Sequence, residues 1–347
     1  MTVRTTEPDP PAPRGNRRRQ PDTAPEHQDG RRQRTHPSTV FPCAGAYARV
    51  GAVFPELRIR LGELRAGRGW VPTPRLLGDP AFRARLLAAE GRRDRFRYGE
   101  PLRPDVAAGF WLHRYLWPAG LLFTLPWFLE RRVPRLPVTA VAFRPATTGG
   151  PAELKVRPAD FACLPDDPAA GLPGARTVPD EAALRAELRA AAVEHLAPVL
   201  DALRPALRRG PRTLWGLATD ELVEGLRYTA GLLGEERRAA DALAALLPGG
   251  TPPFTGAAAF RWTEPAAPGK SRVSADEQAG EGSWDSGSRR DSGSRRDSGS
   301  RRVGAGGRGA TSEPVPDPAP TRTRVSCCLA YTVRSAGSCF SCPRTCS

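Results

Sequence analysis

The strongest pattern along the chain is helical. In TVPDEAALRAELRAAAVEHLAPVLDALRPALRRG, apolar side chains recur every three or four residues and predict one long amphipathic helix. Its apolar face consists of Leu184, Leu188, Ala192, His195, Val199 and Leu203. Thr177 and Asp180 fit a capping box, with Pro179 in the first turn. Pro198 and Pro205 are expected to kink or split the helix, because proline lacks the backbone donor.

Two further helices follow this segment, and a clear one precedes it. Trp215, Leu222, Leu226 and Leu233 share one face of a second amphipathic helix, and DALAALLPGG predicts a short third one that ends at Pro and Gly. Among the short helices expected between residues 58 and 99, GDPAFRARLLAAEGRR is the clearest, with Asp79 and Pro80 as start signals.

A small β region lies between these helical segments. Thr139 to Arg144 and Glu153 to Arg157 read as two short strands, joined by a loop that contains Gly149 and Gly150. The expected fold class is therefore mainly α with a small β region, an α+β arrangement with a helical core.

The segment from Val106 to Leu129 is apolar enough to test as a membrane span. His113 and Arg114 interrupt it, Pro118 and Pro126 each remove a backbone donor, and the uncharged remainder is short for a bilayer. We therefore expect a buried or kinked core helix. A peripheral membrane contact through its tryptophans is the alternative left open.

Both ends of the chain lack the apolar content needed to fold. Residues 1–38 are rich in Pro, Arg, Asp and Gln and are expected to be disordered. Residues 270–321 form a low-complexity linker that contains DSGSRR three times and is long enough to let the tail dock almost anywhere on the core. The expected organisation is thus a helical core at 39–269 and a separate C-terminal segment at 322–347.

The charge and the N-terminal sequence limit the class of protein. The net charge is +15, but arginines are scattered among acids rather than gathered in a stripe with aromatic rings, which argues against nucleic-acid binding. The N-terminal segment has no apolar signal-peptide core, so we expect a cytoplasmic protein. A peripheral position at the inner face of the membrane is the alternative. The cysteines of the chain are then reduced thiols or metal ligands.

Five of the seven cysteines lie in the last residues, RVSCCLAYTVRSAGSCFSCPRTCS. Cys327, Cys328, Cys339 and Cys342 have the spacing C-C-x10-C-x2-C. Structural zinc sites usually pair two C-x2-C knuckles, and this tail has one. The side chains of two adjacent cysteines tend to diverge, which suits a cluster with two irons better than one small ion. A disulfide between adjacent residues would be strained.

The tail is too short to bury a core of its own, so ligation is expected to supply much of its order. Arg324, Arg334 and Arg344 lie close to the cysteines in sequence and could offset the negative charge of a thiolate-bound cluster. The alternative is that these arginines only keep the tail soluble.

SCCLAY followed by C-x2-C-P resembles the C-terminal motif of the FhuF-like ferric-siderophore reductase family. The order of FWLHRYLWPAGLL, a β region and long amphipathic helices is similar to the body of that family, from about Gly69 to Phe260. The resemblance implies a [2Fe-2S] cluster held by Cys327, Cys328, Cys339 and Cys342, with no required role for Cys346. The DSGSRR insert departs from the family pattern, in which the motif follows the core more closely.

The resemblance also implies the activity and the partners. We expect one-electron reduction of chelated Fe3+, with a ferric siderophore, preferably a hydroxamate, as substrate and a ferredoxin-like protein as electron donor, since no flavin or nicotinamide motif is evident. Two rival functions stay open: a non-enzymatic [2Fe-2S] carrier or redox sensor, and a helical binding protein with a structural zinc tail.

The other candidate residues are weaker. His113 and Arg114 could line a siderophore pocket or could equally pair with core carboxylates. His195 is expected to be a satisfied core histidine, and the isolated Cys43 and Cys163 to be small buried side chains. Asp166 and Asp167 lie between Pro and Gly and are assigned to a turn rather than to a metal site.

Overall fold

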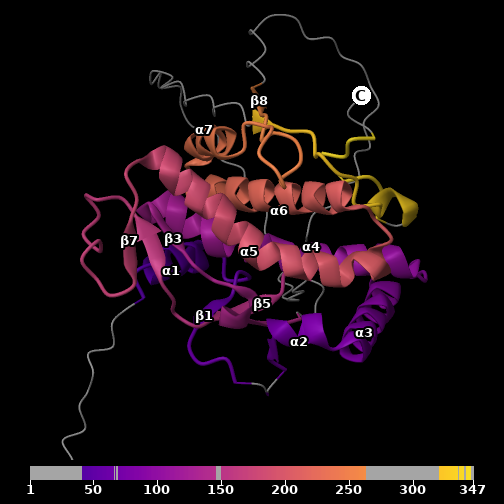
Figure 1. The fold of residues 1–347 in the computed structure, drawn as a ribbon. Helices are drawn as coiled ribbons and strands as arrows, with labels where there is room; N and C mark the ends of the chain where they lie inside the picture. The colour runs from indigo at the N-terminus through magenta and orange to yellow at the C-terminus, as the bar shows by residue number, and fades with distance from the viewer. Residues whose placement is uncertain are drawn as a thin grey trace, which may run out of the picture. The chain divides into compact units, whose positions relative to one another are not determined.

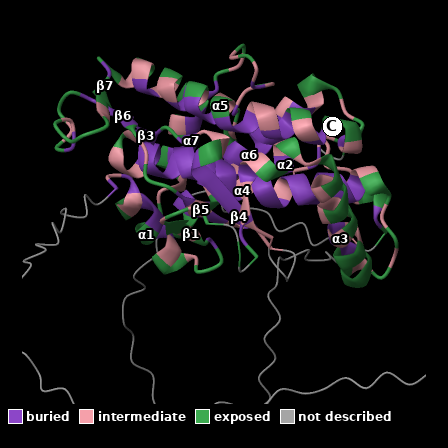
Figure 2. Cartoon of the chain, turned by 60° about the horizontal axis from the view of Figure 1, so that its bottom comes forward, coloured by how far each residue is buried: buried purple, intermediate pink, exposed green. Residues whose placement is uncertain are grey.

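The apolar segment forms one continuous helix in the interior of the fold, α4 (Pro104–Glu130). The computed structural model describes residues 41–65, 67, 69–145, 150–262, 320–334, 336–339 and 341–344. Nearly every side chain of α4 is buried, and Figure 2 shows its ribbon almost entirely in the colour of buried residues. In the part of the chain that is described, no helix has both the length and the apolarity to cross a membrane.

The remaining helices are, in chain order, α1 (Ala44–Val53), α2 (Thr73–Gly78), α3 (Pro80–Tyr98), α5 (Glu181–Leu207), α6 (Pro211–Leu232) and α7 (Glu236–Leu246), with short 3-10 turns η1 (Val138–Ala140) and η2 (Ala330–Thr332). Helices α1, α3, α5 and α6 pack against α4, α2 lies against α3 and α5, and α7 lies against α5 and α6 (Figure 1). The fold is mainly helical, as predicted, and α4, α5 and α6 share one apolar core.

Among the described residues, three small sheets complete the fold. The first has the strand order β1-β5-β4-β2, with β1 Ile59–Leu61, β2 Val71–Pro72, β4 Val141–Arg144 and β5 Glu153–Val156. The second has the order β3-β6-β7, with β3 Arg132–Pro134, β6 Phe161–Cys163 and β7 Ala175–Thr177. The predicted hairpin corresponds to the antiparallel pair of β4 and β5. The sequence pattern did not reveal the other strands, because they are only two or three residues long.

The third sheet joins the core to the C-terminal segment. Strand β8 (Arg261–Trp262) ends the core and pairs antiparallel with β9 (Pro320–Thr321). The chain therefore leaves the core and returns to it at adjacent positions. Residues 263–319, which hold the DSGSRR repeats, lie outside the described residues, as do residues 1–38.

Two details of the helix predictions are corrected. Helix α5 begins at Glu181 with Asp180 as its cap, since the Asp180 carboxylate accepts a hydrogen bond from the Ala183 amide at 2.8 Å, and Thr177 belongs to β7. Pro198 and Pro205 lie inside a helix that is not split. The start signals of α3 are confirmed, because the Asp79 carboxylate accepts from the Phe82 amide at 2.8 Å.

The predicted roles of several buried residues are also confirmed. His195 is fully buried; its Nδ1–H donates to the Leu136 carbonyl at 2.8 Å, and its Nε2 accepts from the Tyr115 hydroxyl at 2.9 Å. Cys43 and Cys163 are buried free thiols. Asp167 lies in a turn, where its carboxylate accepts from the Ala169 amide and pairs with Arg132. The polar groups of His195 and Asp167 therefore have partners within the fold.

Candidate metal centre

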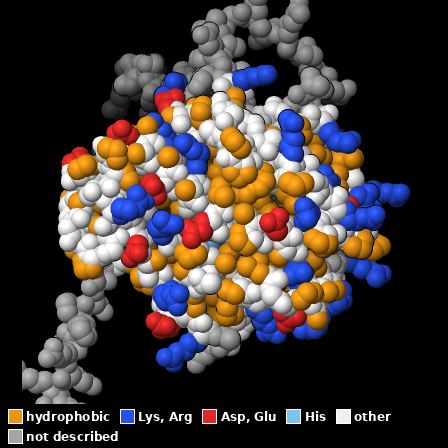
Figure 3. All heavy atoms as spheres, viewed as in Figure 1, with side chains coloured by type: hydrophobic (Ala, Val, Ile, Leu, Met, Phe, Trp, Pro, Cys, Tyr) orange, Lys and Arg blue, Asp and Glu red, His pale blue; other side chains and the backbone are white. Residues whose placement is uncertain are grey.

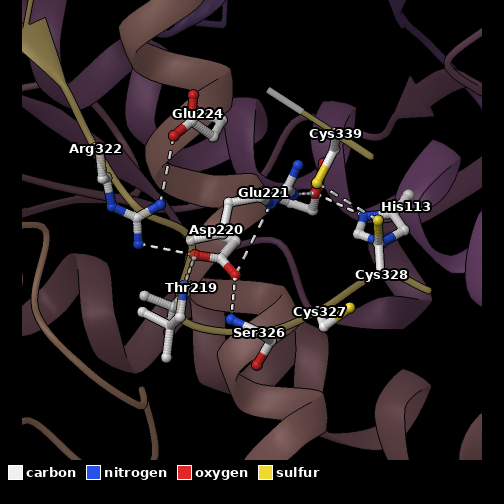
Figure 4. A network of polar contacts seen from close by, with 12 residues as sticks. His113, Thr219, Asp220, Glu221, Glu224, Arg322, Ser326, Cys327, Cys328 and Cys339 are labelled. Carbon is white, nitrogen blue, oxygen red and sulfur yellow. Dashed lines mark hydrogen bonds and ion pairs between the residues drawn. The ribbon is translucent and has the colours of Figure 1, made fainter. Parts of the chain in front are cut away.

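The cysteine tail is held on the core by one buried carboxylate of α6. Asp220 is 0% exposed, and its two oxygens accept hydrogen bonds from the backbone amides of Val325 and Ser326, each at 2.8 Å. These amides directly precede Cys327, as Figure 4 shows. Asp220 therefore fixes the backbone at the point where the cysteine motif begins.

Arginines from the tail complete this polar network. Arg322, whose side chain is 1% exposed, donates to Asp220 at 2.8 Å and lies 3.4 Å from Glu224. Arg324 binds Glu221, the residue next to Asp220. The two arginines thus bring positive charge to Asp220 and Glu221, two buried carboxylates of α6, and to the partly exposed Glu224.

The pKa values of the two central acids move in opposite directions. Burial raises the pKa of Asp220, although Arg322 and Arg324 oppose the effect. Burial also acts to raise the pKa of Glu221, but Arg324 and His113 outweigh it and lower that pKa to about 2. Glu221 is therefore ionised at neutral pH and can accept hydrogen bonds from both partners.

Glycines allow the tail to approach the core closely. A Cβ at Gly216 of α6 would collide with the Ser326 side chain. Gly256 has a φ of +80°, and a Cβ there would lie 2.6 Å from Cγ2 of Val325. Because Gly216 and Gly256 have no side chain, they leave room for the tail backbone that precedes the cysteines.

The middle of the tail, between the two halves of the cysteine motif, has a smaller, mixed contact with the core. Val333 is 3% exposed and packs in an apolar cluster with Val106 and Phe110 of α4. The Arg334 amide donates to the Glu100 carboxylate at 2.7 Å. Cys327 and Cys328 therefore lie between two points at which the tail is attached to the core, and Cys339 and Cys342 follow the second point.

Two thiols from the two halves of the motif meet. The sulfurs of Cys328 and Cys339 lie 3.9 Å apart. In this contact, the hydrogen bond from Cys339 lowers the pKa of Cys328 to about 5 and raises that of Cys339. Cys342 is 1% exposed and its amide donates to the Cys339 carbonyl, whereas Cys327, Cys328 and Cys339 are half-buried.

This geometry can be tested against a thiolate-bound metal. At a metal–sulfur distance of about 2.3 Å, two thiolates of a tetrahedral site lie about 3.8 Å apart. The Cys328–Cys339 separation matches that edge. Within the described residues, no three His, Cys, Asp or Glu side chains converge as ligands of a single ion. Of the four thiols, Cys328 and Cys339 therefore have the separation of two thiolates that share one iron.

His113 of α4 lies beside the thiols. Its Nδ1–H donates to the Glu221 carboxylate at 2.6 Å, and its positive form would lower the pKa of Cys328. Within the described part of the chain, its Nε2 is buried and has no hydrogen-bond partner. Figure 4 shows the ring next to Cys328. A histidine that is oriented by a carboxylate in this way is typical of metal centres.

Arg114, the other weak candidate, is placed differently. Its guanidinium is 9% exposed and binds Glu90 at 3.0 Å and Asp94, two carboxylates of α3. Of the two options that the sequence left open for this residue, the geometry is that of pairing with core carboxylates. His113 likewise pairs with a carboxylate, but at the edge of the cysteine centre.

The sequence did not single out the residues that dock the tail. Asp220, Glu221 and Glu224 read as the polar side of an amphipathic helix, yet Asp220 and Glu221 are buried. Two features of the sequence could have indicated this docking. Arg322 and Arg324 lie just ahead of the cysteines, and a run of acids interrupts an otherwise apolar helix. Cys346 lies outside the described residues.

Comparisons with known proteins place the chain near no established family. No protein-family model matches it, and no curated protein matches it. Among solved structures, it is similar to aerobactin synthetase IucC from a hypervirulent pathotype of Klebsiella pneumoniae, with 15% sequence identity and a TM-score of 0.35. The match covers 53% of this chain and 32% of that chain, so it spans about a third of the synthetase. A likeness at this level carries no functional argument.

Proposed function

We propose that the chain is an iron–sulfur ferric-siderophore reductase. In this proposal Cys327, Cys328, Cys339 and Cys342 hold a [2Fe-2S] cluster, and the protein passes one electron to ferric iron bound by a siderophore. The support comes from the C-C-x10-C-x2-C spacing, from the resemblance of the motif to FhuF-like reductases, and from the donor geometry.

The observation that carries the proposal is the docking of the cysteine segment. Asp220 binds the two amides ahead of Cys327, and the Cys328 and Cys339 sulfurs lie at the separation expected for two thiolates on one metal. A centre fixed to a rigid helix changes its surroundings little on reduction. Such fixed geometry suits electron transfer better than a free tail would.

The surroundings of the thiols fit a redox role. A bound cluster would supply one-electron transfer. Arg324 and Arg344 act electrostatically on the cysteines, Arg324 on Cys328 and Cys339 and Arg344 on Cys327, and stabilise negative charge there. Arg334 has its amide bound to Glu100 and its side chain exposed. Because three of the four thiols are only half-buried, a chelate can approach from solvent without entering the protein.

Reduction releases iron because of ligand preference. Siderophores bind iron through hard oxygen donors, which hold Fe3+ much more tightly than the softer Fe2+. The chelator itself is not consumed. The reductase needs only to approach the chelate and deliver an electron, and this requirement agrees with thiols that are partly exposed at the surface.

A visible spectrum of the purified protein is the first test. A brown protein whose absorbance bands bleach with dithionite supports the cluster, whereas a colourless protein that contains zinc supports the structural-zinc rival. Protein reduced anaerobically and freed of dithionite is then mixed with ferric hydroxamates and catecholates in the presence of a ferrous-specific chelator. Reoxidation that matches Fe2+ capture is expected. If no ferric chelate reoxidises the protein faster than buffer does, the carrier or sensor function replaces the reductase.

A further inference from the structure

The outer face of α3 is basic and carries one exposed aromatic ring. Arg85, Arg92, Arg95 and Phe96 recur at helical spacing, and all four are exposed. Phe96 is 94% exposed, whereas the next most exposed large apolar side chain among the described residues, Val53, is 47% exposed. Arginine and aromatic side chains are the types that dominate binding energy at protein interfaces.

The acidic residues of α3 face inward. Glu90 and Asp94 are each 1% exposed, and both bind the buried guanidinium of Arg114. They are the only acids in α3, so its outer surface carries positive charge alone. Figure 3 shows blue side chains gathered at the lower right of the molecule, where Figure 1 places α3.

This face adjoins the cysteine tail. Tyr98, at the end of α3, packs against the apolar cluster that contains Val333 of the tail. Glu100 follows and accepts the hydrogen bond from the Arg334 amide. A protein bound to the outer face of α3 would therefore lie near the part of the tail around Val333 and Arg334, which joins the two halves of the cysteine motif.

We propose that Arg85, Arg92, Arg95 and Phe96 form a docking face for an acidic one-electron carrier of the ferredoxin type. This inference rests on the proposed function and names the site at which its reductant binds. The carrier loses one electron and this chain gains it, so no further reactant is required. Guanidinium groups pair bidentately with carboxylates, and complementary charge steers the two proteins together.

The composition of the face favours an acidic protein over a membrane. A helix that lies in a membrane surface buries a wide apolar stripe. The apolar side chains of α3, including Phe82, Leu86 and Leu87, pack instead against the core. Phe96 alone is left outside, which matches one aromatic anchor within a charged interface.

The test measures binding of the full-length, cluster-loaded chain to a small acidic [2Fe-2S] ferredoxin at low and high salt. The Arg92→Glu/Arg95→Glu variant is expected to bind about tenfold more weakly at low salt, mainly through slower association, and to lose much of its salt dependence. Phe96→Ser is expected to weaken binding about fivefold with the salt dependence retained. Reduction by dithionite should be unchanged in both variants.

The matched control is Arg65→Glu/Arg157→Glu, which changes net charge equally at two exposed arginines outside α3 and should bind normally. Equal binding by the α3 and control variants, or no binding by the native chain, overturns the docking face. Binding to phosphatidylglycerol vesicles that needs Arg92 and Arg95, without ferredoxin binding, also overturns it and assigns the face to a membrane. Cluster content is measured in every sample, so a chain that takes up no cluster is recognised separately as failure of the proposed function.

Discussion

Helix α6 makes two contacts of opposite character, one with α4 and one with the cysteine tail. Toward α4 it presents apolar side chains such as Leu222 and Leu226, and the backbones come so close that a Cβ at Gly120 would lie 3.1 Å from Cα of Leu222. Toward the tail it presents Asp220 and Glu221. One helix thus holds the core by apolar packing and the candidate metal centre by charge.

The two contacts should respond differently to change. Apolar burial is spread over many side chains, so losing one removes only part of the total. The tail depends on a few buried charges, and removing one leaves its partner unpaired in a dry environment. The site should therefore be lost through single substitutions that leave the core folded.

The largest expected effect is the loss of the cluster without loss of core stability. Replacing Cys327, Cys328, Cys339 or Cys342 by Ser removes a soft thiolate, and we expect loss of most iron and colour while the melting temperature of the core is nearly unchanged. Iron content and the visible spectrum measure this. Cys346→Ser is the control and should keep its cluster. Bleaching by Cys346→Ser but not by Cys342→Ser would show that the ligand set is wrong.

The next effect breaks the docking contact. Asp220→Ala leaves Arg322 and two amides without their shared acceptor, at a cost of about 3–5 kcal/mol in docking free energy. We expect fast hydrogen exchange at Val325 and Ser326 and rapid proteolysis of the tail. Asp201→Ala, at an exposed carboxylate of α5, should change neither. Protected amides in the Asp220 variant would mean that the carboxylate does not anchor the tail.

The core has a pH response of its own. Burial lowers the pKa of His195 to about 4 from an ordinary value of 6.5. Above pH 6.5 both states are neutral, but between pH 6.5 and 4 the unfolded chain binds a proton that the folded chain does not. The free energy of unfolding should thus fall by about 3 kcal/mol as pH drops through this window.

His195→Leu should remove most of that pH dependence, at the expense of lower stability at pH 7, since the Tyr115 hydroxyl loses its acceptor. Urea denaturation at several pH values between 4 and 7 measures both effects. If the free energy of unfolding of the variant falls equally steeply with decreasing pH, groups other than His195 cause the pH dependence.

The contrast between the two contacts also explains what the sequence could predict. The apolar periodicity that contains Leu184, Leu188 and Leu203 located α5, because burial of an apolar stripe leaves a local repeat. Strands such as β6 and β7 leave no such repeat in three residues. Two of the four cysteines predicted as ligands, Cys328 and Cys339, have sulfurs 3.9 Å apart, and cluster binding by the four stays a prediction.

The docking of the tail could not be predicted in the same way. Asp220 and Arg322 are far apart in sequence, and each is an ordinary polar residue in its own segment. Their pairing exists only once α6 has formed and β9 has paired with β8. His113 was noticed because it interrupts an apolar run, but its contact with Glu221 depends on the packing of α4 against α6.

A smaller effect tests the apolar contact alone. Gly120→Ala would place a methyl group against the α6 backbone, and the overpacking should lower the free energy of unfolding by about 1–3 kcal/mol. Gly109→Ala is the matched control in the same helix, where a Cβ meets nothing within 4 Å, and should raise stability by about 0.5–1 kcal/mol. Hydrogen exchange at the Val325 and Ser326 amides of the tail should stay slow in both variants. If both variants are stabilised, the α4–α6 contact is looser than these distances imply.

The smallest effect is expected from the repeat insert. Strands β8 and β9 are paired, so the linker begins and ends at the same place, and its length enters only through the entropy of closing a loop. Deleting Asp285 to Arg302, which lie outside the described residues, should therefore change stability by only a few tenths of a kcal/mol, toward higher stability. Cluster content and the protection of the Val325 and Ser326 amides should be unchanged, whereas Asp220→Ala removes that protection with the linker intact. Loss of iron in the deletion variant would mean that the insert itself helps to dock the tail, and that α6 is not sufficient.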